Sequence, residues 1–486
     1  MLFNSLVYLY LFLPIAVVGY LVASRFLSVR VKNVWLVGVS LFFYGFWNPL
    51  YVPLLIGSIV VNFFLGTFLL NERVFLRTME IPRRAIFIVG IILNLILLGI
   101  FKYTDFFISN INWITGTDIP LAHLVLPLAI SFFTFEQITY LVECYKRTTH
   151  NHGFLNYAIF VTFFPHLIAG PIIFYKDIMP QLGKVKDFSV YYRNIGLGLF
   201  LLSLGLVKKV GIADTFAVWA NAGFAFEGTL TFFDAWATSL SYAFQLYFDF
   251  SGYTDMAIGS ALLFNISLPQ NFNSPYKATN IQDFWQRWHM SLTVWFRAYL
   301  YFPLAVSLRR FGQYGALASL FVTFVIIGLW HGPAWTFVTF GCLHGGAMLI
   351  HHVWKMYAKI SLPTPVAWFL TFNFVNISWI FFRAENFGQI FSMLKSMFGV
   401  NGLGPTSILF VESEKYVARL GVPDFFQREV FVWVLLFLGV VLLLKNSNYY
   451  KEHFSPTLAY LLLTVVFFMI GIVNINKFSE FLYFNF

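Results

Sequence analysis

Long hydrophobic runs, separated by short polar stretches, follow one another along almost the whole chain. A helix needs about 20 mostly apolar residues to cross a bilayer. Segments of this kind are 6–24, 33–48, 50–70, 85–101, 122–143, 154–174, 194–220, 230–263, 314–330, 334–356, 364–382, 429–445 and 457–475. Several are too long or too broken for one simple span. The pattern therefore predicts an all-α polytopic membrane protein with roughly 11–13 membrane helices.

The basic residues between the first runs alternate from one loop to the next. They occur after the first run (Arg25, Arg30, Lys32), after the third (Arg73, Arg77, Arg83, Arg84) and after the fifth (Lys146, Arg147). The loop 48–51 has none, and only Lys102 follows the fourth run. Because basic loops stay in the cytoplasm, this predicts an N-terminus outside the membrane. Beyond residue 175 the charges give no orientation.

The composition agrees with a membrane-embedded chain. Of 486 residues 59% are hydrophobic and only 11% are charged, with a mean hydropathy of +0.75. Soluble domains carry about 25% charged residues, so the polar surface of such a protein is lacking. The net charge of +10 follows the loops and indicates topology rather than binding to nucleic acid. The N-terminus lacks a basic region and a small-residue cleavage site, which favours a retained first helix over a signal peptide.

Polar residues within the hydrophobic runs are candidates for function, because they are costly in a bilayer. The first group lies in 245–255, where Gln245, Asp249 and Asp255 accompany hydroxyl side chains. Gly252 is expected to loosen this helix. The group is interpreted either as a polar staple between helices or as the wall of a cavity, and the two interpretations have equal weight. In both cases the two carboxylates are expected to avoid the lipid.

The second group is an amphipathic stretch, 280–299, expected to be helical. Asp283 and Arg287 are four residues apart and can pair on one helical face, and Trp285 and His289 have the same spacing. A Trp-rich helix with arginines can simply lie in the membrane interface. That alternative accounts less well for His289, whose neighbours are bulky.

Two further histidines lie in apolar surroundings. His331 precedes Gly332 and Pro333, and because proline disfavours a helical residue before it, a helix is expected to end there and expose the imidazole to a cavity. The alternative is a structural histidine bonded to a carbonyl. His344 lies between Gly341 and Gly345, a pair that indicates close helix packing. A zinc site from His331, His344, His351 and His352 lacks the acidic or thiolate partners of strong metal sites, and the two cysteines, Cys144 and Cys342, form no metal cluster.

Four motifs occur in a fixed order: "FDFSGYTDMAIG", "NFNSPY", "FWQRWHMSLTVWFRAYLYFPL" and "GLWHGPAWTF". With "FFPHLIAGPI" (163–172) and the terminal "FLYFNF", they resemble the membrane-bound O-acyltransferase family, and its bacterial branch with the alginate O-acetyltransferase membrane subunit. One departure follows "YLYFPL", where that branch usually has a loop containing Gly and Asn. Here the residues are 305–312, "AVSLRRFG".

The resemblance implies a ring of tilted helices around a funnel, with His331 as the catalytic histidine and His289 as the second histidine of the site. It implies an acyl thioester donor, acetyl-CoA or an acyl carrier protein, with no permanently bound cofactor and no metal. Residues that bind the donor are not identified. The acceptor implied is an extracytoplasmic polysaccharide such as alginate, cellulose or peptidoglycan, reached through a periplasmic or surface SGNH-type partner.

The hydrophobic pattern predicts a single membrane domain over 1–486, and its longest polar interruption, 401–429, is expected to be an extramembrane loop. The core motifs of the resemblance lie in 131–385. The resemblance places the protein in the bacterial cytoplasmic (inner) membrane, among its lipids. Two alternatives stay open. One is D-alanyl transfer for teichoic acids by the same fold, and the other is a transporter or channel without bond chemistry.

Overall fold

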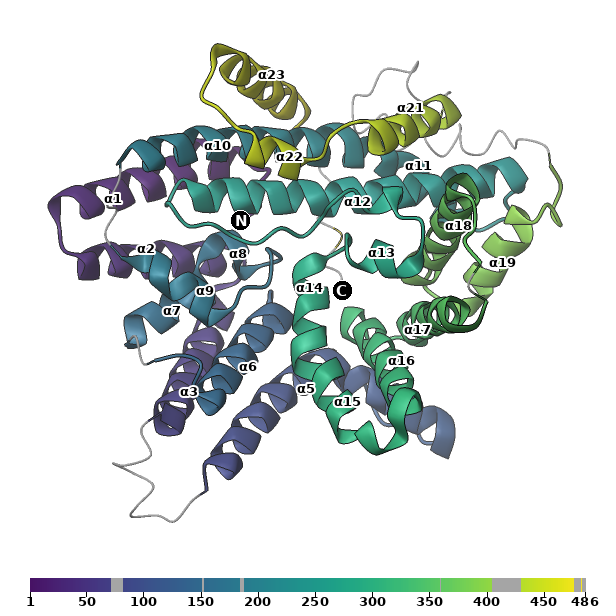
Figure 1. Ribbon diagram of the computed structural model, residues 1–486, viewed down its shortest axis with the longest axis horizontal. Helices are drawn as coiled ribbons and strands as arrows, with labels where there is room; N and C mark the ends of the chain where they lie inside the picture. The colour runs from purple at the N-terminus through teal and green to yellow at the C-terminus, as the bar shows by residue number, and fades with distance from the viewer. Residues whose placement is uncertain are drawn as a thin grey trace. The chain divides into compact units, whose positions relative to one another are not determined.

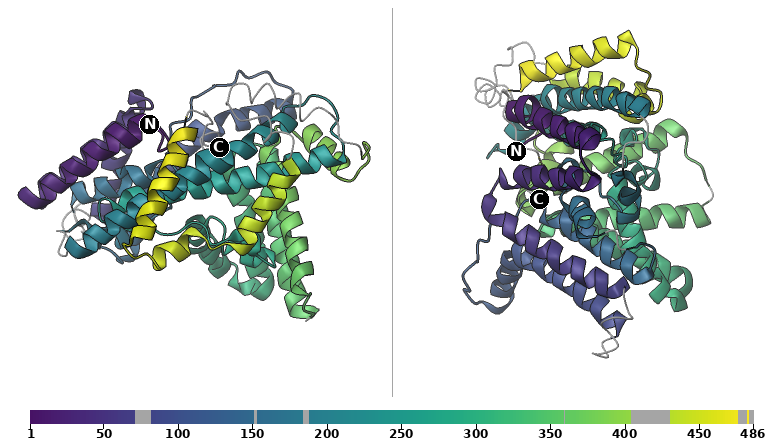
Figure 2. Two further views of the ribbon diagram at one scale, coloured as in Figure 1. Left: turned by 90° about the horizontal axis from the view of Figure 1, so that it is seen from above. Right: turned by 90° about the vertical axis from the view of Figure 1, so that its left-hand side faces the viewer.

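The structure, a computed structural model, describes residues 1–70, 82–150, 153–183, 188–358, 360–403, 430–475 and 482. Every regular element in these ranges is a helix, and no strand appears there in Figure 1 or in the two further views of Figure 2. The all-α architecture predicted from the hydrophobic pattern is confirmed. The predicted loop at 401–429 lies, except for 401–403, outside the described residues.

The chain divides into two compact units. Unit 1 comprises Met1–Leu202, Thr254–Pro269 and Ser455–Leu461, and unit 2 comprises Ser203–Tyr253, Gln270–Phe454 and Leu462–Phe486. Three helices, α10 (Phe188–Leu206), α12 (Phe232–Leu262) and α23 (Leu458–Asn474), continue from one unit into the other. The single domain and the ring around a funnel concern both units together, and both stay predictions.

Polar pairs join the helices of unit 1. Asn62 and Asn94 each donate an amide N–H to the other's oxygen, over 3.3 and 2.6 Å, and Tyr8 Oη lies 2.7 Å from Ser260 Oγ. Such bonds hold membrane helices together. Besides its parts of the three shared helices, the unit holds η1 (Tyr8–Phe12), α1 (Leu13–Phe26), α2 (Val29–Gly45), η2 (Pro49–Tyr51), α3 (Val52–Leu70), α5 (Arg83–Thr115), α6 (Ile130–Lys146), α7 (Phe154–Thr162), α8 (Phe164–Leu167), α9 (Tyr175–Ile178) and η3 (Met179–Leu182).

Unit 2 carries both predicted site histidines. Aromatic side chains fill its interior, and Trp288 and Trp379 are among the largest that are fully buried. Besides its parts of the shared helices, it holds η4 (Val207–Ala213), α11 (Asp214–Phe224), η5 (Pro275–Lys277), α13 (Ile281–Trp285), α14 (Met290–Phe296), η6 (Arg297–Tyr301), α15 (Phe302–Ser307), η7 (Arg309–Phe311), α16 (Gly312–His331), α17 (Trp335–Tyr357), α18 (Thr364–Arg383), α19 (Phe387–Met397), α21 (Val430–Leu443) and α22 (Ser447–Glu452).

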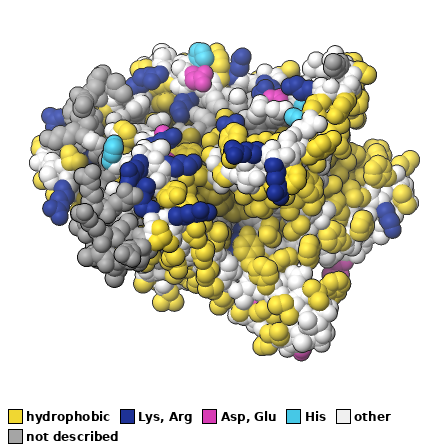
Figure 3. Space-filling view, turned by 60° about the horizontal axis from the view of Figure 1, so that its bottom comes forward, with side chains coloured by type: hydrophobic (Ala, Val, Ile, Leu, Met, Phe, Trp, Pro, Cys, Tyr) yellow, Lys and Arg dark blue, Asp and Glu magenta, His cyan; other side chains and the backbone are white. Residues whose placement is uncertain are grey.

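Six helical segments in the described ranges are long and apolar enough to cross a membrane: Tyr8–Phe26, Pro49–Leu70, Arg83–Thr115, Tyr191–Phe224, Arg309–His331 and Thr364–Arg383. Val430–Leu443 and Leu458–Asn474 are shorter apolar helices. The outward side chains of all these apolar helices are mostly large and hydrophobic. Hydrophobic side chains cover much of the molecular surface that Figure 3 shows. Such a surface suits lipid rather than water.

Three predicted segments are shortened or broken in the structure. Residues 122–129 are not helical, so the predicted helix 122–143 begins only at Ile130. The run 154–174 breaks at Phe163, whose ψ of 107° is not helical, directly before Phe164 and Pro165. The stretch 280–299 is also broken, after Trp285 and again before Met290. Hydropathy alone does not report the first two breaks, because most residues at them are apolar too.

Candidate active site

His331 is the last residue of α16. Gly332 follows in an extended conformation, with φ −162° and ψ 151°, and α17 begins at Trp335. Pro333 lies between the two helices and cannot continue the helical hydrogen bonds. The helix end predicted at this histidine is therefore confirmed.

The His331 imidazole lies in an aromatic enclosure. Its ring centroid is 4.9 Å from that of Trp330, 5.0 Å from Phe382 on α18 and 6.2 Å from Phe340 on α17. The residue is only 3% exposed, although the sequence predicted exposure to a cavity. The difference arises because aromatic rings from three helices converge on the turn. The enclosure keeps bulk water from the imidazole.

His289 lies at a break in the chain rather than within a helix. It precedes α14 with φ 42° and ψ 55°, the left-handed region, and it is fully buried. This conformation is uncommon for residues other than glycine because the Cβ atom is crowded. The break turns His289 away from the helical register with Trp285 that the spacing predicted. The ion pair predicted beside it does form, since Arg287 Nε lies 2.7 Å from Asp283 Oδ1.

The segment 271–273 holds the strained backbone at His289. Met290 donates its N–H to the carbonyl oxygen of Asn271, and Asn273 donates its N–H to that of Arg287, both over 2.9 Å. The Asn271 side-chain oxygen accepts from Ser291 Oγ at 2.6 Å and from Ser291 N at 3.2 Å. A strained conformation persists where its surroundings determine it in this way. The "NFNSPY" motif thus positions the "RWH" motif.

Trp330 brings the two histidines into one cluster. Its ring centroid lies 6.4 Å from that of His289 and 4.9 Å from that of His331. Phe250 of α12 closes another side of His289, with centroids 4.8 Å apart. Two buried imidazoles from separate elements therefore contact the same indole within unit 2.

His344 is held in a different network. Its Nδ1 accepts a hydrogen bond from Trp285 Nε1 at 3.1 Å, and its Nε2 lies 2.9 Å from Ser378 Oγ. Because Nδ1 accepts, the proton of a neutral ring is on Nε2, which donates to the serine. Phe340, whose ring is 4.5 Å from His344, also contacts His331. His344 thus supports the wall of the enclosure.

Glycines let α16 and α17 pack closely, as the small residues predicted. A Cβ atom at Gly341 would lie 2.5 Å from the Phe324 carbonyl oxygen, and one at Gly328 would lie 2.3 Å from the Phe337 carbonyl oxygen. Figure 1 shows the two helices side by side. The turn that carries His331 joins these two helices, so their contact sets its position.

A buried ion-pair cluster lies in the polar group around Asp249. Lys209 Nζ is 2.6 Å from Asp249 Oδ1 and 2.9 Å from Asp214 Oδ1, and all three side chains are at most 2% exposed. Leu482 donates its backbone N–H to Asp249 Oδ2 at 3.0 Å. Asp249 therefore acts as the polar staple that was one of the two interpretations. Asp255 is also buried, at 3% exposed.

Gly252 does not loosen α12, which runs unbroken through it. A Cβ atom there would lie 2.8 Å from the Gly205 carbonyl oxygen and 2.9 Å from the Lys209 amide nitrogen. The expectation of a loosened helix is wrong, because this glycine admits a neighbouring backbone instead.

Several residues of the cluster were not identified from the sequence. Trp330 and Phe382 were counted among the abundant aromatic residues, and Asn271 lies in a motif with no charge. A further polar residue of unit 2, Asn376 on α18, is 1% exposed, and neither atom of its amide has a hydrogen-bond partner among the described residues. A buried amide in an apolar helix is a usable signal, since such groups are costly unless they have a role.

Comparison with known proteins places the chain among acyltransferases. Residues 87–388 match the membrane-bound O-acyltransferase family. A peptidoglycan O-acetyltransferase of Helicobacter pylori is 42% identical over an alignment of 525 residues that covers 100% of this chain and 98% of the relative. A probable alginate O-acetylase of Pseudomonas aeruginosa is 38% identical, with 82% of this chain and 75% of the relative covered.

A teichoic acid D-alanyltransferase of Bacillus subtilis is more distant, at 29% identity over 55% of this chain. The resemblance inferred from the motifs is confirmed, and the apolar helices agree with a multi-pass membrane protein. The matched range 87–388 includes both histidines of the cluster. This chain is an acyltransferase and belongs to the membrane-bound O-acyltransferase family.

Proposed function

We propose that this chain is an O-acetyltransferase that moves an acetyl group from a cytoplasmic acyl thioester towards hydroxyl groups of an extracytoplasmic polysaccharide. The family transfers acyl groups, so an acyl donor is a substrate, and acetyl-CoA is the donor we propose. Peptidoglycan is the first acceptor, because the relative named for it aligns with the whole chain. Alginate is the second acceptor that we propose, because the alignment with the probable alginate O-acetylase of Pseudomonas aeruginosa covers 82% of this chain.

The observation that carries this proposal is the pair of buried imidazoles on Trp330. A hydroxyl is a poor nucleophile at neutral pH and needs a base within hydrogen-bond reach. Histidine suits that task because its ordinary pKa of about 6.5 lies near neutrality. An enclosure of aromatic rings keeps water from competing with the hydroxyl for the acyl group.

In the proposed reaction His331 accepts the proton of the attacking hydroxyl. The hydroxyl oxygen forms a bond to the thioester carbonyl carbon, and the carbonyl oxygen takes the negative charge. His289 orients the acceptor or donates a hydrogen bond to that oxygen, a role that contributes about 2.7–4 kcal/mol elsewhere. The carbon–sulfur bond then breaks, and the proton on His331 passes to the thiolate that leaves.

We propose that the chain works with a periplasmic or surface SGNH-type partner that delivers the acetyl group to the polysaccharide. We also propose that it lies in the bacterial cytoplasmic membrane with its N-terminus outside, as the basic loops predict. The donor would then approach from the cytoplasmic face. The acceptor or the partner would approach from the opposite face.

The direct test replaces His331 by alanine and compares acetylation with protein abundance. His352, exposed on α17, provides the matched control. We expect His331→Ala to lower ester-linked acetate in isolated peptidoglycan to background, since losing a positioned base lowers rates about 10²- to 10⁴-fold. His352→Ala should acetylate as wild type does. Near-normal acetylation by a well-expressed His331→Ala protein would contradict the proposal.

The donor is tested in proteoliposomes that contain the purified protein and its partner. Radiolabelled acetyl-CoA supplied to one face should yield labelled ester on an acceptor at the other face. A D-alanyl carrier protein should yield none, because the D-alanyl relative is more distant than the acetylating ones. Transfer of D-alanine instead of acetate would favour the alternative function. Transport that survives loss of His331, with no acyl product, would indicate a transporter.

A further inference from the structure

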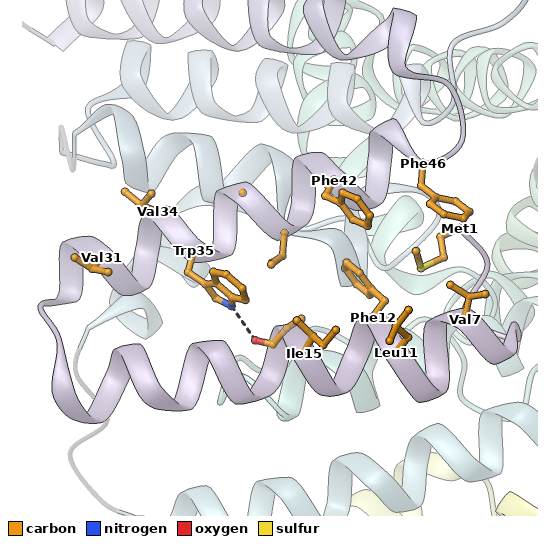
Figure 4. Close-up of a pocket in the computed structure, with 13 residues that line it drawn as sticks. Met1, Val7, Leu11, Phe12, Ile15, Val31, Val34, Trp35, Phe42 and Phe46 are labelled. Carbon is orange, nitrogen blue, oxygen red and sulfur yellow. Dashed lines mark hydrogen bonds between the residues drawn. The ribbon is translucent and has the colours of Figure 1, made fainter.

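An apolar groove runs between α1 and α2 in unit 1. Its volume is about 640 Å³. Figure 4 shows the lining side chains of both helices facing one another across it, from Val31 near the turn between the helices to Met1, Val7 and Phe46 at the far end. No charged side chain lines it. The groove lies beside Tyr8–Phe26, a segment long and apolar enough to span a bilayer.

The spacing of the lining residues makes the groove continuous. Val7 directly before η1, Leu11 on η1 and Ile15 on α1 lie four residues apart, and all three are exposed. Gly38, Phe42 and Phe46 repeat the same interval along α2. Residues three or four apart share one helical face, so each helix presents one apolar stripe. The stripes face each other and remain accessible from outside.

Trp35 braces the two helices across the groove. It reaches from α2 towards α1 and donates its Nε1–H to the Ala16 carbonyl oxygen over 2.9 Å. Gly19 makes room for the ring, since a Cβ atom there would lie 2.3 Å from it. Gly38, in contrast, would place a Cβ atom in open space, with nothing within 4 Å. The spacing of the helices is therefore set, and the space beside Gly38 is left for a ligand.

Size decides which occupant fits. A spanning helix is a cylinder about 10 Å wide and 30 Å long, and hence roughly 2,400 Å³ in volume. The groove offers about a quarter of that volume. A whole spanning helix is too large to lie within the groove, so a single extended hydrocarbon chain is the better fit. Because the lining is apolar and lies along a membrane span, the available hydrocarbon is that of a lipid.

Charge decides which end holds the headgroup. Arg25 in the last turn of α1 and Arg30 in the first turn of α2 flank the connection between these helices, and both are exposed. Arg30 directly precedes Val31 at the groove's end. Lys32 is already committed, because its Nζ donates to the carbonyl oxygens of Leu182 and Gly183. At the far end, residues 44–51 include no Lys or Arg. The Met1 amino group also lies at that end, but burial lowers its pKa to about 6, so it is mostly uncharged at neutral pH. A phosphate therefore finds permanent cations at the arginine end only.

We propose that the groove binds one acyl chain of an anionic phospholipid, with its phosphate at Arg25 and Arg30. The groove belongs to unit 1 and the histidine cluster to unit 2, and the inference does not rest on the proposed function. A bound lipid of this kind fills the space that Trp35 holds open between α1 and α2. It makes the first helical pair a lipid-selective part of the fold.

The test is native mass spectrometry of the full-length protein in detergent, with equal amounts of phosphatidylglycerol and phosphatidylcholine added. We expect wild type to retain one phosphatidylglycerol per chain. Gly38→Phe should lose it, because the ring fills the groove. Gly57→Phe is the matched control, since Gly57 is also an exposed helical glycine with nothing within 4 Å, and it should retain the lipid.

A second variant tests the headgroup. Each arginine near a membrane surface contributes to anion attraction, so Arg25→Gln with Arg30→Gln should lower the preference for phosphatidylglycerol by up to about 30-fold. The acyl chain should still bind. Should Gly38→Phe fail to accumulate, Val34→Phe narrows the same groove from an exposed position and should also lose the lipid.

Three outcomes would overturn the proposal. Retention of phosphatidylglycerol by monodisperse Gly38→Phe, at the wild-type level, would exclude this groove. Equal retention of both lipids by wild type would exclude a phosphate site at the arginines. Co-purification of a membrane-spanning protein that is lost only in Gly38→Phe would assign the groove to a partner helix instead.

Discussion

His289 combines a buried imidazole with a left-handed backbone, so its side chain and its backbone can be tested separately. Its φ is 42°, a conformation that costs an ordinary residue about 1–2 kcal/mol and glycine almost nothing. Hydrogen bonds from the 271–273 segment hold it there. If the imidazole takes part in acyl transfer, a substitution that only relieves the backbone strain cannot restore activity.

We therefore expect His289→Gly to accumulate better than His289→Ala but to remain as inactive. The loss should be about 10²- to 10³-fold if the imidazole donates to the oxyanion. Acetyl ester per unit of membrane protein is the quantity to measure in both variants. An active His289→Gly protein would mean that this position contributes only its backbone.

Lys209 is a buried cation between two buried carboxylates. Removing one member of a buried pair destabilises a protein by about 3–5 kcal/mol, because an uncompensated charge remains. Lys209→Met should therefore lower the thermal midpoint sharply. The double variant Lys209→Met with Asp249→Asn should recover part of that loss, because one of the two orphaned carboxylates is removed. Thermal unfolding in detergent, followed by size-exclusion chromatography, measures both, and no recovery would argue against the pairing.

Individual residues were predictable where their chemistry stands out against the apolar background. His331 before Pro333, and the Asp283–Arg287 pair, are of this kind. Trp330 was not predictable, because an indole in an aromatic-rich chain has no distinctive local context. Asn271 was missed for a related reason, since its importance lies in hydrogen bonds to residues twenty positions away.

At the scale of the element, α16 and α17 form the support for His331. The contact between the two helices depends on glycine, because a Cβ atom at Gly341 would lie 2.5 Å from the Phe324 carbonyl oxygen. Gly346 lies on the same helix but a Cβ atom there meets nothing within 4 Å. The two positions have the same propensity cost in a helix. They differ only in packing.

Gly341→Ala should destabilise the protein by about 1–3 kcal/mol, the usual range for overpacking, and should displace the turn at His331. Activity should then fall more than abundance. Gly346→Ala should be neutral or slightly stabilising, because alanine favours helix. The comparison uses melting temperature and acetyl ester for both variants. Equal effects of the two changes would show that the contact between α16 and α17 does not position His331.

The helix boundaries show what hydrophobic pattern can and cannot predict. Predicted 364–382 and observed Thr364–Arg383 nearly coincide, because polar or proline residues bound the run. The predicted helix 280–299 failed, since tertiary hydrogen bonds from Asn271 and Asn273 stabilise a break that local preference does not signal. The α5 helix extends to Thr115, beyond the predicted end at 101, because residues on its exposed final turns are less apolar.

At the scale of the whole molecule, the orientation in the membrane determines which face meets the donor. The basic turns predict that 25–32 lies in the cytoplasm and 48–51 outside. Ser28 lies in the turn that precedes α2 and Leu50 in the short turn that follows it, and both are exposed, Leu50 to 81%. A reporter thiol in either turn can therefore react without disturbing a buried contact.

We expect Leu50→Cys to react with a membrane-impermeant maleimide in intact cells, and Ser28→Cys to react only after permeabilisation. Thr78→Cys, outside the described residues, should behave like Ser28→Cys, because the arginines around it favour the cytoplasm. Cys342, which is partly exposed, must first be replaced by serine, and that parent serves as the blank. If Ser28→Cys reacts from outside while Leu50→Cys is protected, the orientation is reversed. A cytoplasmic thioester would then have to approach the face of the protein that carries residues 48–51, and the basic turns would lie outside.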